Sequence, residues 1–198
     1  MANAITTARF PLLAVLVILL YLGTPLARII AVPLLILLLA MDTLDGVVAR
    51  YRGETSLLGS VLDVASDRTV EQVLWIVLAD LGMVSIIIPL IIVPRGILTD
   101  AIRSVAVSSG IEPFEMMRSR VGKFLVQSPV MRTSYSASKV VAFVGMTVAY
   151  MLQGLGHAWY TVWNIALFSS WIALALCLLR GLPVIIEAPR FFRGLEET

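Results

Sequence analysis

Four aspartates interrupt two strongly apolar stretches of the sequence. Asp42 and Asp45 are three positions apart, and Asp63 and Asp67 are four positions apart. On an α-helix, residues at these spacings lie on one face, so each pair would present its two carboxylates together. An ionised carboxylate at the centre of a membrane helix costs about 2.5–3.5 kcal/mol. We therefore expect a partner that offsets the charge of these acids.

Divalent cations are the partner that four facing carboxylates predict. A turn at residues 51–55 would reverse the chain, so that two antiparallel helices bring the acids together near one membrane surface. Carboxylate oxygens suit Mg²⁺, Mn²⁺ or Ca²⁺, and two such cations sharing bridging carboxylates suit phosphoryl chemistry. Gly46 and Gly59 leave room beside the acids for a ligand. Arg50 can hold a phosphate through two hydrogen bonds.

Two other interpretations of the acids remain open. They could form structural ion pairs with nearby arginines, namely Arg50, Arg52 and Arg68. They could also line the ion path of a membrane transporter. Ion-coupled transporters are expected to show repeated halves with matching broken helices, and we find no internal repeat in this sequence. A metal-dependent site is the interpretation that the sequence favours.

The composition indicates which kind of fold must position these side chains. The chain has 198 residues, of which 59% are hydrophobic and 14% charged, and its mean hydropathy is +0.95. Soluble domains are about 25% charged, so we expect an integral membrane protein. A soluble enzyme, a nucleic-acid-binding module and a disulfide-rich secreted domain are disfavoured. The single Cys177 excludes an intrachain disulfide.

Six apolar stretches are candidates for membrane-spanning helices, each of which needs about 20 apolar residues. They cover approximately residues 10–23, 26–50, 56–81, 83–105, 137–155 and 160–179. Residues 107–135 form a polar segment, which we interpret as an amphipathic cytoplasmic helix, a loop or a lid, and a charged tail follows Arg180. We predict an all-α integral membrane protein, a six-transmembrane-helix bundle that forms a single domain over residues 1–198.

The placement of lysine and arginine predicts the orientation of this bundle. In the six-helix arrangement, residues 51–55, residues 106–136 and the C-terminal tail fall on one side and carry most of the 15 basic residues. The opposite loops carry almost none, with Arg28 as the exception. Basic segments face the cytoplasm. We therefore expect both termini and the aspartate site on the cytoplasmic side of the cytoplasmic membrane.

Residues 42–67 resemble a known family signature. They read D-T-L-D-G-V-V-A-R, then eight residues, Gly59, three residues, Asp63, three residues and Asp67. This pattern is similar to the signature of the CDP-alcohol phosphatidyltransferase family, D-x2-D-G-x2-A-R-x8-G-x3-D-x3-D. Every specified position is present at its spacing, and the six-helix arrangement also resembles that of the family.

The resemblance implies an activity and a set of ligands. The family transfers a phosphatidyl group from CDP-diacylglycerol to an alcohol and releases CMP. Two Mg²⁺ or Mn²⁺ ions would be bound by Asp42, Asp45, Asp63 and Asp67, and Asp67 would also be the general base that deprotonates the acceptor. The CDP-lipid would be bound by Gly46, Ala49, Arg50, Ser56, Gly59, Asn3 and Thr6. Family members are often homodimers, so the expected partners are a second copy, the donor lipid, a small polar alcohol and membrane lipid, with no nucleic acid.

The same resemblance favours one branch of the family. Asn3-x2-Thr6-x2-Arg9 is similar to a segment of the phosphatidylglycerophosphate synthase and cardiolipin synthase branch. This makes glycerol 3-phosphate the leading acceptor. Gly96 stands where that branch has glutamate, which leaves phosphatidylinositol-phosphate synthase and cardiolipin synthase as alternative activities. A family member that binds CDP-lipid without turnover is a further alternative, which the intact Asp67 disfavours.

Four basic residues form the predicted acceptor site. Arg95 and Arg103 would lie two helical turns apart near a cytoplasmic helix end, where two guanidinium groups suit a phosphate. Arg132 and Lys139 complete the set. The alternative for all four is anchoring to lipid headgroups at the membrane surface.

Overall fold

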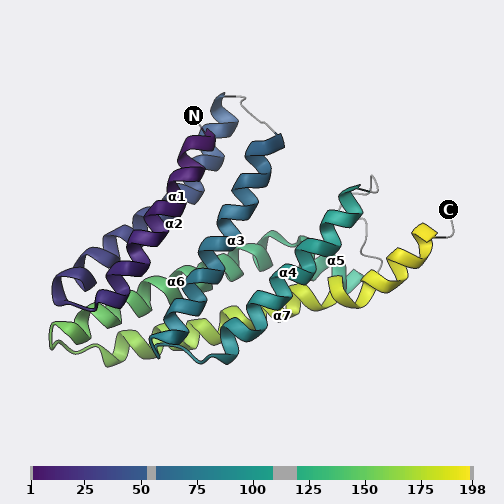
Figure 1. Ribbon diagram of the computed structural model, residues 1–198. Helices are drawn as coiled ribbons and strands as arrows, with labels where there is room; N and C mark the ends of the chain where they lie inside the picture. The colour runs from purple at the N-terminus through teal and green to yellow at the C-terminus, as the bar shows by residue number, and fades with distance from the viewer. Residues whose placement is uncertain (1, 53–56, 109–119, 197–198) are drawn as a thin grey trace. The chain divides into compact units, whose positions relative to one another are not determined.

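The computed structural model describes residues 2–52, 57–108 and 120–196, and within these ranges the chain forms seven α-helices and no strand. In chain order they are α1 (Ala2–Leu22), α2 (Pro25–Arg52), α3 (Leu57–Asp80), α4 (Ile87–Ser108), α5 (Arg120–Gln127), α6 (Pro129–Gly154) and α7 (Tyr160–Glu196) (Figure 1). The predicted all-α fold class is therefore confirmed.

The helices group into two compact units. The first unit comprises Met1–Ile86 and Val140–Phe168, and the second comprises Ile87–Lys139 and Ser169–Thr198. Helices α6 and α7 therefore contribute to both units. The prediction of one domain over residues 1–198 stays a prediction.

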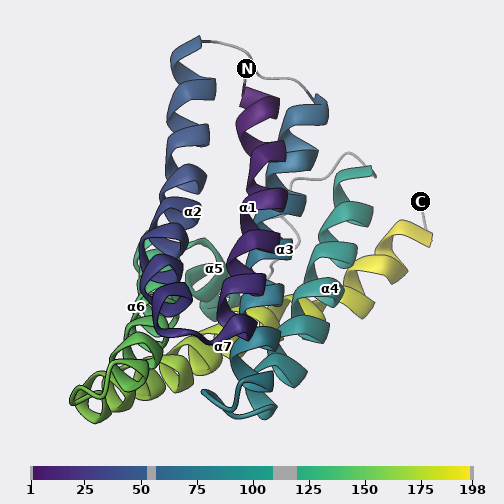
Figure 2. The same ribbon diagram turned by 60° about the vertical axis from the view of Figure 1, so that its left-hand side comes forward.

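Helix α1 is the central helix among the first three. It packs against both α2 and α3 and lies between them (Figure 2). The core of the first unit includes Leu16, Leu35 and Leu74, which are fully buried. Trp75 on α3 lies with its ring centroid 4.6 Å from that of Phe143 on α6, so this part of α6 packs on α3.

The second unit has a smaller core. Ala106 of α4, Val126 of α5 and Val184 of α7 are buried together, with Ile102 packed against them. The hydroxyl of Ser169 on α7 donates a hydrogen bond of 2.9 Å to the Ser138 carbonyl on α6. These contacts hold the four helices of the unit around one another.

Sharp turns connect the helices at one end of the first unit. Gly82 after α3 and Gly156 after α6 have φ of 70° and 71°, a left-handed conformation that glycine adopts without a Cβ clash. At the start of α2, the Ala27 amide donates to the Thr24 hydroxyl at 3.3 Å, and Pro25 occupies the first helical position, where no amide donor is needed.

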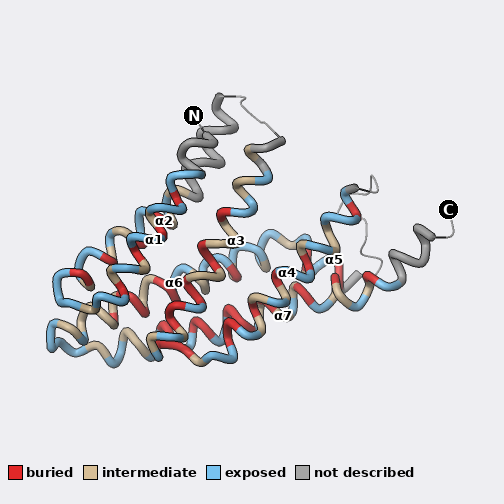
Figure 3. Tube along the Cα trace, viewed as in Figure 1, coloured by how far each residue is buried: buried red, intermediate tan, exposed pale blue. Residues whose placement is uncertain are grey.

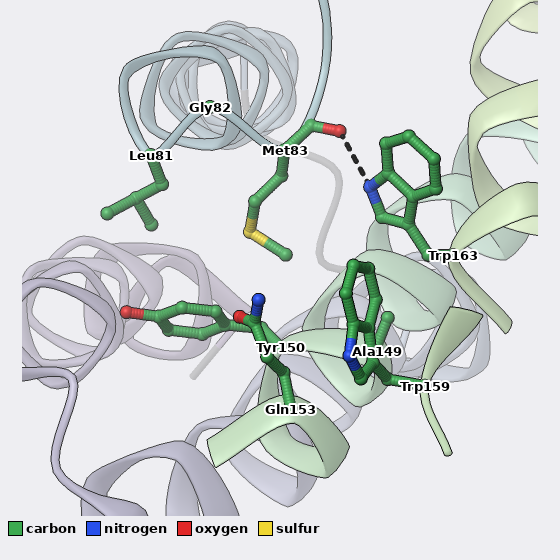
Figure 4. Close-up of a pocket in the computed structure, with 8 residues that line it drawn as sticks. All are labelled: Leu81, Gly82, Met83, Ala149, Tyr150, Gln153, Trp159 and Trp163. Atoms are coloured by element: carbon green, nitrogen blue, oxygen red, sulfur yellow. Dashed lines mark hydrogen bonds between the residues drawn. The ribbon is translucent and has the colours of Figure 1, made fainter. Parts of the chain in front are cut away.

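The same end of the first unit holds a cavity of about 150 Å³. Tyr150, Gln153, Trp159 and Trp163 line it together with the turn after α3 (Figure 4). The Trp163 indole donates a hydrogen bond of 3.2 Å to the Met83 carbonyl (Figure 4). The aromatic side chains here therefore pack against and fix the turn.

Each of the six apolar stretches is largely helical in its described residues, but four boundaries differ from the prediction by four residues or more. The first stretch belongs to a helix that begins at Ala2 rather than near residue 10, and the helix of the fourth begins at Ile87 rather than near residue 83. The fifth stretch belongs to a helix that begins at Pro129 rather than near residue 137, and the sixth continues to Glu196 rather than ending near residue 179. Within the polar segment 107–135, the described residues are helical except Ser128, and residues 109–119 lie outside the described part.

Two helices are long and apolar enough to cross a membrane, by length and composition, in the part of the chain that the structure describes. They are Pro129–Gly154 and Tyr160–Pro189, and shorter apolar helices cover Thr7–Leu22 and Pro25–Met41. Buried and exposed positions alternate along the helices (Figure 3), and many exposed side chains are large and apolar, such as Leu90 and Phe168. The count of six spans and the orientation of the termini stay predictions.

Candidate active site

The signature residues lie on α2 and α3 where these helices approach their connecting segment. The end of α2 and the start of α3 lie at the same end of the first unit (Figures 1 and 2). With a rise of 1.5 Å per residue, positions 45 and 63 both lie about 10 Å from these helix ends, and positions 42 and 67 about 15 Å. Measured along each helix, the two aspartate pairs therefore lie at similar distances from the segment that connects α2 and α3.

Of the four signature aspartates, Asp63 and Asp67 are the two whose side chains the structure describes. They lie one turn apart on α3, at the spacing that puts both on one helix face. Gly59 lies one turn before Asp63 on the same helix, so the residue next to Asp63 on this side of α3 has no side chain. Their oxygens are ligands of the kind that Mg²⁺ and Mn²⁺ take.

Arg9 on α1 reaches the Asp67 carboxylate. Its Nη1 atom donates a hydrogen bond of 2.7 Å to Asp67 Oδ1, across 58 positions of sequence. The Arg9 side chain is 2% exposed, whereas that of Asp67 is 43% exposed. The ion pair therefore joins a buried cation to an accessible carboxylate.

Ser66 completes the contact between α1 and α3. Arg9 Nη1 also donates to Ser66 Oγ at 3.0 Å, and that hydroxyl donates in turn to the Asp63 carbonyl oxygen at 3.0 Å. Ser66 is fully buried. One guanidinium group thus fixes α1 against the turn of α3 that carries both aspartates.

The sequence interpretation gave no role to Arg9 or Ser66. Arg9 was noted only as the last residue of the Asn3-x2-Thr6-x2-Arg9 segment. Its spacing from Asp67 is too long for any local pattern to predict the contact. The available signals for Arg9 are this segment and the position of a basic residue at the start of an apolar stretch.

Several predicted site residues lie outside the described side chains. Ser56 falls in the segment that the structure does not describe. For the others the helix is described but the side chain is not: Asn3, Thr6, Asp42, Asp45, Gly46, Ala49 and Arg50. Among the described residues, no group of three or more potential metal ligands is present. The four-aspartate metal site therefore stays a prediction.

The predicted acceptor residues belong to the second unit, on α4 and α6. Arg95 lies against Gly181 of α7, where an added Cβ would overlap the arginine side chain. Arg103 is two turns further along α4 and partly buried, and Arg132 on α6 is exposed. Lys139 lies with its Nζ 4.5 Å from the centroid of the Tyr135 ring.

Arg180 on α7 joins this group, although the sequence interpretation assigned it no function. Its guanidinium carbon is 5.6 Å from the centroid of the same Tyr135 ring, and Tyr135 is 5% exposed. Two cations from different helices thus approach one buried aromatic ring. This arrangement concentrates positive charge where α6 and α7 meet in the second unit.

A comparison with protein families decides the class of the molecule. The profile described as CDP-alcohol phosphatidyltransferase matches residues 1–179, which include both aspartate pairs. The chain belongs to the CDP-alcohol phosphatidyltransferase family. The comparison with curated proteins gives no match.

Membership in this family identifies the class of reaction that the protein catalyses. A CDP-alcohol phosphatidyltransferase is an enzyme that transfers a phosphatidyl group from a CDP-alcohol donor to an alcohol acceptor, a step of phospholipid synthesis. Such enzymes generally depend on divalent metal. The predicted enzyme class is therefore confirmed, and the apolar helices agree with a membrane location.

Proposed function

We propose that this phosphatidyltransferase uses CDP-diacylglycerol as donor and a phosphorylated alcohol as acceptor, with glycerol 3-phosphate as the leading acceptor. The acceptor oxygen forms a bond to the phosphorus that carries diacylglycerol, and the bond from that phosphorus to CMP breaks. The products are phosphatidylglycerophosphate and CMP. The observation that carries the proposal is the complete aspartate signature, whose two pairs lie at similar distances along α2 and α3 from the segment that connects these helices.

Asp67 is proposed as the general base. A base must contact the acceptor hydroxyl, and the Asp67 side chain is accessible enough for that contact. The proton of the acceptor hydroxyl passes to the Asp67 carboxylate as the new bond to phosphorus forms. Asp63, one turn away on α3, is proposed to lie beside the same reaction centre.

Metal ions would be held by Asp42, Asp45, Asp63 and Asp67. Hard carboxylate oxygens fit Mg²⁺ or Mn²⁺, and the described pair on α3 has such oxygens one turn apart. Bound cations would neutralise the donor diphosphate and the charge that develops on CMP. We propose two ions from the number of carboxylates.

The donor headgroup is proposed to lie along the signature helices. Gly46 and Gly59 would let the diphosphate approach the backbone closely, and Arg50 would hold a phosphate by two hydrogen bonds. Ala49, Ser56, Asn3 and Thr6 complete the proposed CDP-lipid set. Position 6 lies one turn before Arg9 on α1, and Arg9 contacts α3, which supports placing the start of α1 beside the signature.

The acceptor phosphate is proposed to bind the cations of the second unit. Arg95, Arg103, Arg132 and Lys139 are the residues that the sequence predicts, and Arg180 is added from its position beside Tyr135. Guanidinium groups bind phosphate through paired hydrogen bonds. A phosphate-bearing acceptor is therefore favoured over a neutral alcohol or serine.

The enzyme is proposed to work as a homodimer in the cytoplasmic membrane, with six spans and with the active site and both termini on the cytoplasmic side. The apolar composition and the placement of basic residues support this orientation. At a membrane surface, the acyl chains of the donor stay in lipid while its headgroup and the acceptor meet in water.

The test is CMP release from CDP-diacylglycerol by the purified full-length chain in detergent with Mg²⁺. Parallel reactions contain glycerol 3-phosphate, inositol 1-phosphate, inositol, serine or phosphatidylglycerol. Release with glycerol 3-phosphate alone would support the leading proposal. Release with inositol 1-phosphate or phosphatidylglycerol would instead identify a phosphatidylinositol-phosphate synthase or a cardiolipin synthase. The absence of release with every acceptor would contradict the proposed donor and acceptor.

A further inference from the structure

Arg9 is a cation buried inside the first unit. Transferring an arginine from water into such a place is unfavourable unless the charge is paired and hydrogen-bonded. Its Nη1 atom donates to Asp67 Oδ1 at 2.7 Å and to Ser66 Oγ at 3.0 Å, and both of these residues belong to α3. The cost of burying Arg9 is thus offset at the turn of α3 that carries the proposed metal ligands.

The hydrogen bond from Arg9 constrains the Asp67 carboxylate. A charge-assisted N–H···O⁻ bond is short and roughly twice as strong as a neutral one. Ser66 restrains the guanidinium from a second direction and is itself tied to the Asp63 carbonyl. The orientation of Asp67 is therefore set from α1, while 43% of its side chain stays exposed.

From this geometry we infer that Arg9 is a positioning residue of the active site, which acts through Asp67 and holds its carboxylate in the orientation that binds a divalent cation. The inference rests on the proposed function, because it takes Asp67 to be a metal ligand. The aspartate signature begins at Asp42 and does not include Arg9, and the resemblance of the Asn3-x2-Thr6-x2-Arg9 segment gave Arg9 no role of its own.

Two effects of Arg9 on cation binding have opposite signs. Its positive charge repels a cation near Asp67, whereas its hydrogen bond holds the carboxylate in one orientation. Residues that orient metal ligands typically change metal affinity or activity by about 10- to 100-fold when they are replaced. The orienting effect is the larger one, so removing Arg9 weakens cation binding instead of strengthening it.

The experiment measures Mn²⁺ affinity and CMP release on the full-length chain in detergent. Mn²⁺ is the probe, and free Mn²⁺ is followed by its electron paramagnetic resonance signal. We expect Arg9→Gln to weaken Mn²⁺ affinity by about 10- to 100-fold and to lower kcat. Arg9→Lys, which keeps the charge but offers different donor geometry, should recover part of both.

The matched control is Arg28→Gln, which removes a cation from α2 at the other end of the same unit. Arg28 donates to the Gly23 and Tyr150 carbonyls and stacks 3.7 Å from the Tyr150 ring centroid. This variant loses structural contacts of a similar kind, and we expect wild-type Mn²⁺ affinity and kcat.

If Arg9→Gln does not fold, Ser66→Ala replaces it, because this change removes one acceptor of Arg9 and keeps the ion pair. Ser66→Ala should weaken Mn²⁺ affinity by less than the factor of about 10 to 100 that is expected for Arg9→Gln.

The outcomes separate this inference from the proposed function. Folded Arg9→Gln protein with unchanged or tighter Mn²⁺ binding would overturn the inference. An equal loss of Mn²⁺ affinity in Arg28→Gln and Arg9→Gln would also overturn it. The same holds if the wild-type protein does not bind Mn²⁺. Wild-type protein that binds Mn²⁺ but releases no CMP with any acceptor would contradict the proposed function alone, and the loss of Mn²⁺ affinity in Arg9→Gln would still support the positioning role.

Discussion

Gly181 on α7 lies so close to Arg95 on α4 that a Cβ at position 181 would overlap the arginine side chain. Where the two helices approach each other, the long side chain of Arg95 therefore packs against Gly181, which has no side chain. Arg95 is one of the residues proposed to bind the acceptor phosphate. Gly181 thus determines where that guanidinium group can lie.

We predict that Gly181→Ala raises the KM for glycerol 3-phosphate and leaves the KM for CDP-diacylglycerol within about twofold. The added methyl group displaces Arg95, and a hydrogen bond to a charged group contributes roughly 1.5–3 kcal/mol, or about 10- to 150-fold. Steady-state CMP release at varied acceptor concentration measures both constants. Leu182→Ala, at an exposed position of the same helix, is the control. An unchanged acceptor KM in Gly181→Ala would remove Arg95 from the acceptor site.

The position of Asp67 predicts the effect of removing its charge. Asp67→Asn keeps the volume of the side chain but cannot accept the acceptor proton, so we expect kcat to fall by about 100-fold or more. CMP release and size-exclusion elution should be measured on the same preparation. Asp80→Asn is a matched control, because Asp80 is an aspartate at the other end of α3 that accepts a hydrogen bond of 2.6 Å from the Tyr21 hydroxyl. Near-normal turnover in Asp67→Asn would refute the assignment of the base.

The proposed metal site predicts a requirement for divalent cations. Chelation with EDTA should abolish CMP release, and added Mg²⁺ or Mn²⁺ should restore it. Asp63→Ala removes one proposed ligand, so the Mg²⁺ concentration for half-maximal activity should rise by about tenfold or more. The Asp80→Asn protein should keep the wild-type Mg²⁺ requirement. Full activity in EDTA would show that the four aspartates have another role.

Arg103 and Arg180 can be tested as acceptor ligands by the same assay. Arg103→Ala and Arg180→Ala should each raise the acceptor KM far more than the donor KM, because each removes a charged donor proposed to bind the acceptor phosphate. Phosphatidyl transfer to inositol, which lacks a phosphate, gives the comparison if the enzyme accepts it at all. An unchanged acceptor KM would assign these arginines to anchoring at lipid headgroups.

The helices that carry the signature could be predicted from the sequence because apolar stretches and aspartate spacings are local patterns. The end of α7 could not. The sequence predicts that the sixth stretch ends near residue 179, before a charged tail that follows Arg180, yet the helix continues to Glu196 with Pro183 and Pro189 inside it. Proline removes a backbone donor and kinks a helix, but here Val184 and Ala188 are buried, and this burial stabilises the continuation.

The candidate site shows the same division between local and distant information. The spacing of Asp63 and Asp67 is local, and the structure places both on one turn of α3 as predicted. Arg9 and Arg180 reach their partners through tertiary packing of α1 on α3 and of α7 on α6. No periodicity in a single sequence encodes such contacts, so the sequence assigned neither arginine a role, whereas the helical spacing of the two acids could be predicted from it.

The close approach of α6 and α7 in the first unit predicts a stability effect that is independent of catalysis. A Cβ at Gly145 of α6 would lie 2.8 Å from the Ala166 Cβ of α7, so the two helices meet through small residues, as membrane helices commonly do. Gly145→Leu should separate them and destabilise the protein by about 1–3 kcal/mol, measured as a lower thermal unfolding temperature in detergent. Val141→Leu on α6, at an exposed position, adds apolar volume away from this contact and should leave that temperature unchanged. An equal shift in both variants would mean that the loss does not come from the contact between Gly145 and Ala166.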